Sequence, residues 1–231
     1  MMNLKHRSYK KELLDDEDID SADLRRNLDE LNFINTWLGG HKVSIEGFKK
    51  LLQKEKKITV CEIGCGGGDN IFAIARWCAR NGVEASFIGI DMKPVCIDFA
   101  KQKNGHDSAE WIVSDYAKVK FHSKPDIIFS SLFCHHFTDE QLAFQLAWMK
   151  ENSKHGFFIN DLERNRIAHQ LIKWLTRLFS RSYLVKNDAP LSVARGFKKD
   201  EWKKLLKEAD VYEYVVENKW AFRHLVVCKH E

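Results

Sequence analysis

The sequence predicts an α/β fold in which a mostly parallel sheet of seven strands, with an antiparallel last strand, is covered by helices. Short β-branched, apolar segments alternate with helical patterns from about residue 57 to residue 160. These strand segments are apolar on both faces, as is typical of parallel sheets buried between helices. Four glycines in five residues, Gly64 to Gly68, follow the first strand. A glycine cluster at that point predicts a ligand crevice at the carboxyl edge of the sheet.

Composition fits an ordinary globular protein with a sizeable core. The chain has 231 residues, of which 44% are hydrophobic and 30% charged, and its formal net charge is +4. That charge is too small to indicate nucleic-acid binding by itself. The six cysteines lack the spacing of a zinc or iron–sulfur site, and the amino terminus lacks the apolar core of a secretion signal. We therefore expect free thiols and a cytoplasmic location.

Helices precede the first strand. Gly39 and Gly40 end a helix whose apolar residues recur at helical spacing, namely Leu24, Leu28, Leu31, Ile34 and Leu38. A second helix is predicted over residues 45–54. Residues 1–56 are thus expected to form an amino-terminal helical cap, and residues 57–231 the sheet domain.

The remaining elements follow in order along the chain. Five apolar segments predict strands, at residues 57–64, 85–91, 109–115, 125–132 and 156–160. Helices are predicted between them over residues 69–82, 93–104 and 138–152, the last opened by a capping-box pattern. Residues 162–197 form an insertion whose helix carries an apolar face from Ile167 to Leu178. After a helix over 199–209, segments 211–217 and 222–229 predict a closing hairpin around Asn218 and Lys219.

The glycine cluster fits one of two ligand classes better. A dinucleotide fingerprint requires a third glycine at position 69, where this chain has Asp69. A carboxylate there would also repel a pyrophosphate. The spacing Glu62-x-Gly64-x-Gly66-x-Gly68 instead resembles motif I of the class I S-adenosylmethionine-dependent methyltransferases, which have a Rossmann-like fold. A nicotinamide oxidoreductase is correspondingly disfavoured.

The resemblance implies S-adenosylmethionine as the cofactor and a set of contacts for it. Asp91 ends the second strand and would bind the ribose hydroxyls, and Asp115 ends the third strand and would hold the adenine amino group. Alternatively, Asp91 caps the helix that begins near Pro94, and Asp115 is an exposed loop residue. The full implied set is Glu62, Gly64, Cys65, Gly66, Gly68, Asp91, Met92, Asp115, Tyr116 and Ser131.

The residues at the end of the fourth strand help to identify the class of methyl acceptor. Methyltransferases that act on the amines of nucleic-acid bases often carry a Pro-Pro pair after this strand, whereas this chain has Ser130 to Phe133 without proline. Metal-dependent catechol methylation needs acidic ligands after strands four and five. Asn160 and Asp161 resemble half of that set, but the fourth strand offers Ser131 instead. We therefore expect no metal.

The adjacent residues His135 and His136 lie where the acceptor should meet the methyl group. A neutral imidazole there could accept the proton of a phenol or enol. Alternatively, one or both histidines only pack beside the cofactor. His136 is the preferred base, and neighbouring side chains would point to opposite sides if this segment is extended.

The acceptor pocket is expected to lie under a lid formed by the amino-terminal helices and the 162–197 insertion. The segments around residues 30–42 and 159–197 resemble a bacterial subgroup linked with polyketide and quinone-like metabolites. That resemblance implies O-methylation of an apolar, hydroxylated aromatic, quinol or polyketide-like small molecule. Two alternatives remain, a cofactor-binding protein without catalysis and a methyltransferase acting on RNA or protein.

Overall fold

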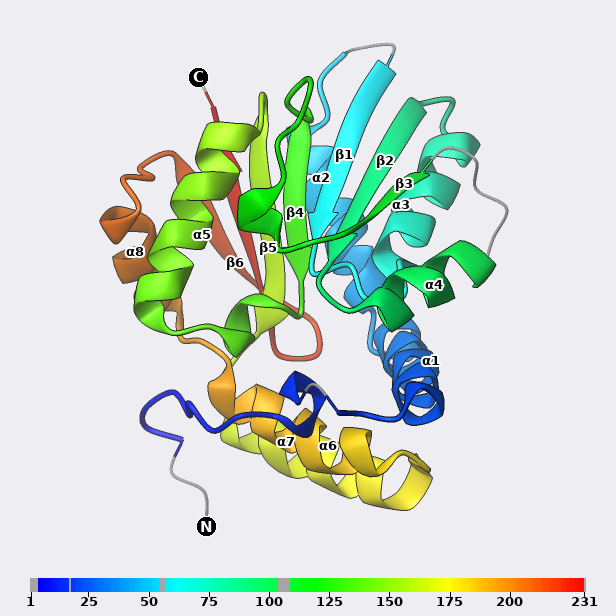
Figure 1. Cartoon of the computed structure of the whole chain (residues 1–231). Helices are drawn as coiled ribbons and strands as arrows, with labels where there is room; N and C mark the ends of the chain where they lie inside the picture. Colours follow the sequence, from blue (N-terminus) through cyan, green and yellow to red (C-terminus); the bar gives the residue numbers. More distant parts are fainter. Residues whose placement is uncertain (1–3, 17, 55–56, 104–108, 231) are drawn as a thin grey trace.

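The structure is a computed structural model that describes residues 4–16, 18–54, 57–103 and 109–230. Its centre is a seven-stranded sheet with the order β3-β2-β1-β4-β5-β7-β6 (Figure 1). Two predicted boundaries, at residue 56 between cap and sheet domain and at Asn104 at the end of a helix, lie outside the described ranges.

The strands confirm the predicted sheet. They are β1 (Lys57–Ile63), β2 (Glu84–Asp91), β3 (Ala109–Val113), β4 (Ile127–Ser131), β5 (Gly156–Leu162), β6 (Tyr214–Lys219) and β7 (Arg223–Lys229). Strands β1 to β5 pair in parallel, and β7 pairs antiparallel with both β5 and β6. The hairpin turn lies later than predicted, at residues 220–222, where Ala221 and Phe222 have positive φ angles of 59° and 55°.

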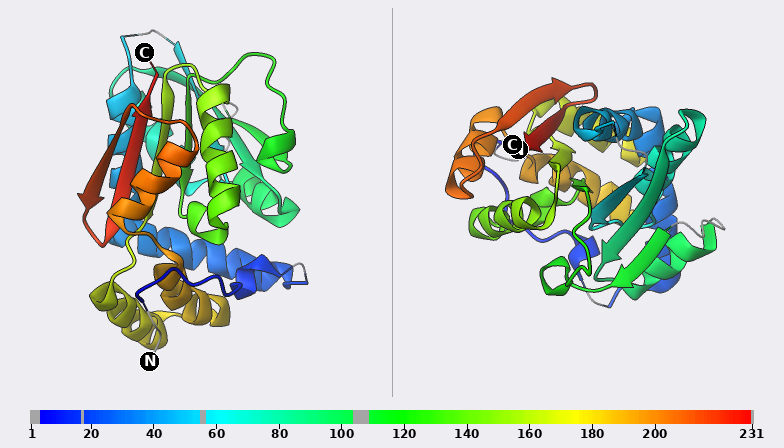
Figure 2. Two further views of the ribbon diagram at one scale, coloured as in Figure 1. Left: turned by 90° about the vertical axis from the view of Figure 1, so that its left-hand side faces the viewer. Right: turned by 90° about the horizontal axis from the view of Figure 1, so that it is seen from above.

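Helices cover both faces of the sheet (Figure 2). The helices are α1 (Ser21–Trp37), α2 (Gly40–Leu51), α3 (Asp69–Arg80), α4 (Pro94–Lys103), α5 (Asp139–Asn152), α6 (Arg166–Phe179), α7 (Tyr183–Arg195) and α8 (Lys199–Glu208). Two apolar clusters form the core, one containing residues of α2 and α3 and the other containing residues of α5 and α8. Close packing between α2 and the sheet requires a glycine at position 47, where a Cβ atom would lie 2.5 Å from the Phe158 ring.

A third layer lies beyond the carboxyl ends of the strands. The α6–α7 hairpin, the chain before α1 and the short 3₁₀ helix η1 (Leu13–Asp15) face that edge of the sheet (Figure 1). The insertion holds two helices rather than the single predicted helix, because residues 180–182 interrupt it and α7 continues through Pro190. This layer is connected to α1 by Glu30, which accepts hydrogen bonds from the backbone N–H groups of Arg181 and Ser182.

All six cysteines are buried free thiols, as expected from their spacing. Within the described ranges, the helices are too short or too polar to cross a membrane.

Candidate active site

The glycine loop between β1 and α3 has a backbone that other residues adopt with strain. Gly64, Gly66 and Gly68 have positive φ angles of 65°, 51° and 75°. Aromatic rings also press on the loop. A Cβ atom at position 64 would lie 2.3 Å from the ring of Phe133, and one at position 68 would lie 2.4 Å from the ring of Trp111. The loop therefore needs glycine both for its conformation and for close approach.

Glu62 lies at the end of β1 beneath this loop and is almost completely buried. Its Oε2 atom has no hydrogen-bond partner among the described residues. Burial raises the pKa of Glu62 well above its usual range, and the nearby Asp69 and Asp91 raise it further. An unpartnered carboxylate oxygen among other carboxylates suits a cationic ligand, so this site fits the ammonium and sulfonium groups of S-adenosylmethionine.

Asp91 ends β2, as predicted, whereas Asp115 lies two residues beyond the end of β3 and caps a short 3₁₀ helix, η2 (Tyr116–Lys118). The Asp91 carboxylate accepts hydrogen bonds from the backbone N–H of Gly66 and of Lys93, both at 2.9 Å. It thus connects the glycine loop to the β2–α4 turn. Asp115 accepts a hydrogen bond from the N–H of Ala117 at 3.1 Å. Both carboxylates cap local backbone and lie at the edge where the cofactor is expected.

The four remaining residues of the implied cofactor-binding set lie in different surroundings. Cys65 is buried next to the loop, and Met92 is exposed in the β2–α4 turn. The hydroxyl of Ser131 accepts a hydrogen bond from Nδ2 of Asn160 at 3.3 Å. The ring of Tyr116 packs edge-on against Trp148 at a centroid distance of 5.1 Å and is buried in the core.

His135 forms a buried pair with Asp161 at the end of β5. Its Nδ1 lies 2.8 Å from Oδ1 of Asp161, and its backbone N–H donates to Oδ2 of the same residue at 3.2 Å. Burial opposes the ionisation of Asp161, but His135 outweighs it and lowers the pKa of Asp161. Because an ionised carboxylate only accepts hydrogen bonds, Nδ1 carries a proton, and in the neutral imidazole Nε2 is the nitrogen with the free lone pair.

His136 forms a second pair, with Asp15 of η1, in which Nδ1 and Oδ1 are 2.8 Å apart. Burial again opposes ionisation, but the hydrogen bond and charge of His136 lower the pKa of Asp15 to about 2. The two histidines do not point to opposite sides, so that expectation is wrong. They belong to a 3₁₀ helix, η3 (Cys134–His136), and their ring centroids lie 4.4 Å apart.

Glu12 lies between the two imidazoles. Its carboxylate oxygens are 3.6 Å from Nε2 of His135 and 3.9 Å from Nε2 of His136. It accepts a hydrogen bond from Ser192 at 2.9 Å, and Nε of Arg195 lies 3.8 Å away. Burial raises the pKa of Glu12 to about 7. The cluster can therefore hold or release a proton near neutral pH.

Glu12, His135 and His136 also place three potential metal-ligand atoms within 4.8 Å of one another. A positive charge already lies beside them, because the Arg195 guanidinium is 3.8 Å from Glu12 and 3.4 Å from Asp15. Arg195 also donates from Nε to the carbonyl oxygen of His135 at 2.9 Å. This guanidinium would repel a divalent ion.

A cavity of about 230 Å³ opens beside the histidines. Its apolar wall comes from α1, α6, α7 and the β6–β7 turn, through Leu31, Ile34, Leu38, Leu171, Leu175, Val193 and Trp220. Polar groups on the wall include Glu12, His135, His136 and Arg223. Arg223 is buried, and its guanidinium donates to Oδ1 of Asn35 at 2.8 Å. The cavity thus combines a large apolar surface with one concentrated polar cluster, as small-molecule sites do.

Sequence reasoning missed Glu12, Asp15 and Arg195 as functional candidates. Glu12 and Asp15 precede the first long helix in an acidic, irregular segment that resembles a solvated tail. Arg195 lies at the end of α7, a helix that the sequence pattern did not predict. Asp161 was considered only as half of a metal site, whereas it is the hydrogen-bond partner of His135.

Comparison with known proteins agrees with this geometry. A family model described as a methyltransferase domain matches residues 54–210. The chain belongs to this methyltransferase family. As a methyltransferase with this motif I, it uses S-adenosylmethionine as its cofactor. No curated protein sequence matches the chain.

Solved structures share the methyltransferase fold at low identity. The plantazolicin methyltransferase BpumL, in complex with SAH, superposes with a TM-score of 0.69 at 18% identity, covering 93% of this chain and 92% of that one. Human N-acetylserotonin methyltransferase, in complex with SAM, superposes with a TM-score of 0.65 at 12% identity. That match covers 92% of this chain and 57% of the human enzyme.

Proposed function

We propose that this methyltransferase transfers a methyl group to a hydroxyl oxygen of an apolar small molecule, such as a hydroxylated aromatic, a quinol or a polyketide-like enol. One observation carries the proposal. The wall of the apolar cavity includes Glu12, His135 and His136, and each of these histidines is paired with an aspartate. A carboxylate behind each Nδ1 leaves both Nε2 atoms as proton acceptors, which a hydroxyl nucleophile requires.

Different residues of the site would bind the cofactor and move the proton. Glu62, the glycine loop, Asp91 and Asp115 would hold the cofactor, with contributions from Cys65, Met92, Tyr116 and Ser131. Bound S-adenosylmethionine supplies a methyl group that is already activated on a sulfonium. His136 accepts the acceptor's hydroxyl proton at Nε2, and Asp15 stabilises the imidazolium that results. His135 and Glu12 are neighbouring sites to which that proton can pass.

His136 is preferred over His135 as the base for a structural reason. Its side chain is 16% exposed, against 3% for His135. His136 therefore offers the more accessible Nε2 to an acceptor. We also propose that no metal takes part, because Arg195 supplies the positive charge beside Glu12. The buried free thiols favour a reducing compartment, so we propose that the enzyme works in the cytoplasm.

A product assay tests this function. The purified chain would be incubated with labelled S-adenosylmethionine and a panel of phenols, quinols and enols, each paired with its amine analogue. Methyl ethers identified by mass spectrometry would support O-methylation. Transfer only to amines, or only to RNA or protein, would contradict it.

A further inference from the structure

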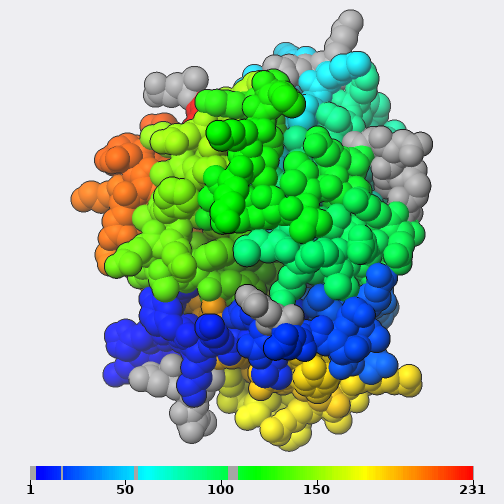
Figure 3. Space-filling view, in the orientation of Figure 1, coloured from blue at the N-terminus to red at the C-terminus, as the bar shows by residue number. Residues whose placement is uncertain are grey.

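Helix α6 exposes an apolar face that no other part of the described structure covers. Six of its seven large apolar side chains are exposed by between 42% and 77%, namely Ile167, Leu171, Trp174, Leu175, Leu178 and Phe179. The spacing of Ile167, Leu171, Trp174 and Leu178 places them on one stripe of the helix. The buried residues of α6 are Ala168, His169 and Thr176, which are small or polar. Figure 3 shows this region as the lower surface of the molecule.

The side chains of the α6–α7 hairpin that carry charge to the surface are all basic. Within residues 166–195, the basic side chains that reach solvent are Arg166, Lys173, Arg177, Arg181 and Lys186. The only acidic residue in that range, Asp188, is buried and accepts hydrogen bonds from the N–H groups of Leu13 and Leu14. None of the five basic side chains forms an ion pair with another described residue. The hairpin's own side chains therefore present a positive surface, and the Glu30 carboxylate of α1 lies at its turn.

The apolar face continues into the acceptor cavity. Leu171 and Leu175 of α6 line that cavity as well as the exposed face. Trp220 of the β6–β7 turn, which is 79% exposed, lines the same cavity. A molecule dissolved in an apolar phase against α6 would meet the cavity without crossing water.

We propose that α6 docks in the interface of an anionic lipid membrane, with its apolar face among the acyl chains and its basic residues at the headgroups. An apolar face with Trp, Leu and Phe beside Lys and Arg is the pattern of helices that lie in a membrane surface. A second copy of the chain fits this face less well. In a twofold dimer the same patch meets itself, so the basic residues of both copies would face one another.

Docking would also define the acceptor class, in a step that rests on the proposed function. The cavity would open toward the bilayer, so the acceptor would be an amphiphile that partitions into lipid. Its hydroxyl would reach the Glu12, His135 and His136 cluster at the inner wall.

Vesicle binding tests the docking without any acceptor. The full chain would be sedimented with phosphatidylcholine vesicles that contain or lack about 30% phosphatidylglycerol. We expect binding to the anionic vesicles that weakens with salt. The double variant Trp174→Glu/Leu178→Glu should bind at least about tenfold more weakly, because two charges would enter the interface. Arg177→Gln/Arg181→Gln should weaken binding by about tenfold or more.

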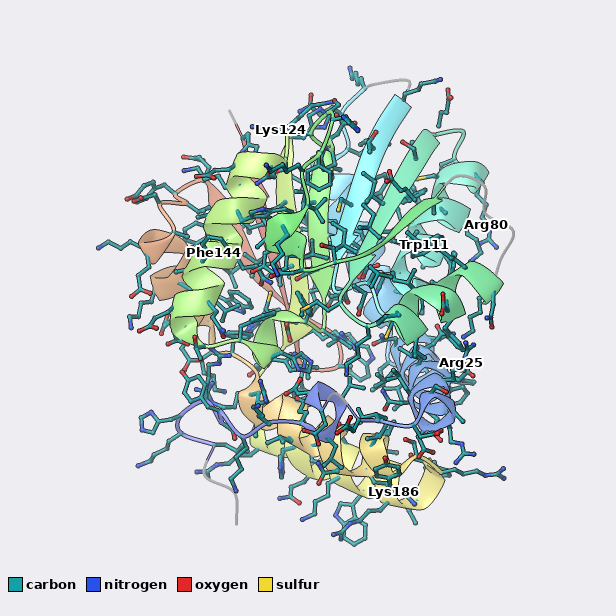
Figure 4. The ribbon with its side chains drawn as sticks, viewed as in Figure 1. Arg25, Arg80, Trp111, Lys124, Phe144 and Lys186 are labelled. Atoms are coloured by element: carbon teal, nitrogen blue, oxygen red, sulfur yellow. The ribbon has the colours of Figure 1, made fainter. Side chains whose placement is uncertain are left out.

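Matched controls lie elsewhere on the surface. Phe144→Glu on α5 and Arg80→Gln/Lys124→Gln, at positions away from α6, should bind as the wild type does (Figure 4). Unchanged affinity for S-adenosylhomocysteine would show that each variant is folded. No vesicle binding, equal binding of the α6 variants and controls, or a dimer in ultracentrifugation that Trp174→Glu/Leu178→Glu dissociates would overturn the proposal. Each of these outcomes is independent of whether O-methylation is observed.

Discussion

Nδ1 of His136 lies 2.8 Å from Oδ1 of Asp15, although the two residues are 121 positions apart in the chain. The pair connects the irregular amino-terminal segment to the end of the fourth strand. The same segment also brings Glu12 beside both imidazoles. The polar side of the cavity is therefore completed by residues that lie outside the matched methyltransferase domain.

Replacement of His136 should separate catalysis from cofactor binding. His136→Ala should lower turnover by about 100- to 10,000-fold, the usual contribution of a general base. Asp15→Asn should lower it less, because the imidazole remains but loses its ionised partner. Affinity for S-adenosylhomocysteine should stay unchanged in both. His122→Ala, at an exposed position, serves as the control. Full activity of His136→Ala would mean that positioning alone drives the transfer.

Asp91→Ala should weaken cofactor binding. The carboxylate would bind the ribose, and it connects the N–H groups of Gly66 and Lys93. Hydrogen bonds to a charged group contribute roughly 1.5–3 kcal/mol each, so titration calorimetry should show at least a tenfold loss of affinity for S-adenosylhomocysteine. Asp98→Ala, on the exposed side of α4, should bind normally. Wild-type affinity of a folded Asp91→Ala would refute the assignment.

Glu12 should make stability depend on pH. Because its pKa in the folded state is raised to about 7, it contributes stability that is present at low pH and is lost as pH rises from about 4.5 through 7. Gln cannot ionise, so Glu12→Gln lacks this loss. The free energy of unfolding of Glu12→Gln, relative to that of the wild type, should therefore increase between pH 5 and pH 8. The gain should be on the order of 3 kcal/mol. Denaturant titrations at both pH values measure it, and a constant difference would contradict the burial of an ionisable Glu12.

Removal of metal ions should leave activity intact. Dialysis against a chelator, followed by assay and by elemental analysis, tests the proposal that Arg195 takes the place of a cation. Loss of activity that zinc or magnesium restores in wild type, but not in Glu12→Gln, would instead identify Glu12 and the histidines as metal ligands.

The layer over the cavity should close on its ligands. Glu30 connects α1 to the α6–α7 turn, so the two parts are expected to respond together. Hydrogen exchange should slow in α1 and α6 when S-adenosylhomocysteine and an acceptor bind, while α5 changes little. Glu30→Gln should uncouple the two responses. Equal exchange of α1 and α6 with and without ligands would rule out a lid.

Much of the fold was predictable because its signals are local. Alternation of apolar strands and helices predicts the sheet, and the spacing from Glu62 to Gly68 predicts the loop and its ligand class. Capping residues such as Thr138 also reveal helix ends from adjacent residues. These features depend on neighbours within a few positions, so one sequence is enough to find them.

The rest depends on contacts across long chain distances. Nothing near Asp15 in sequence indicates that it would meet His136. Helix α7 was hidden because Pro190 and the polar residues before it resemble a loop. The histidine orientations were mispredicted because the end of β4 turns into a 3₁₀ helix, which no local pattern announces.

The position of Glu12 and Asp15 in an irregular segment has a consequence for inactivation. That segment is held by individual contacts, such as those of Asp188 with Leu13 and Leu14 and of Arg7 with Asp139, rather than by the sheet ladder. Such segments detach at a lower free energy than the core unfolds. In mild denaturant the enzyme would therefore lose turnover while its sheet remains folded and its cofactor remains bound.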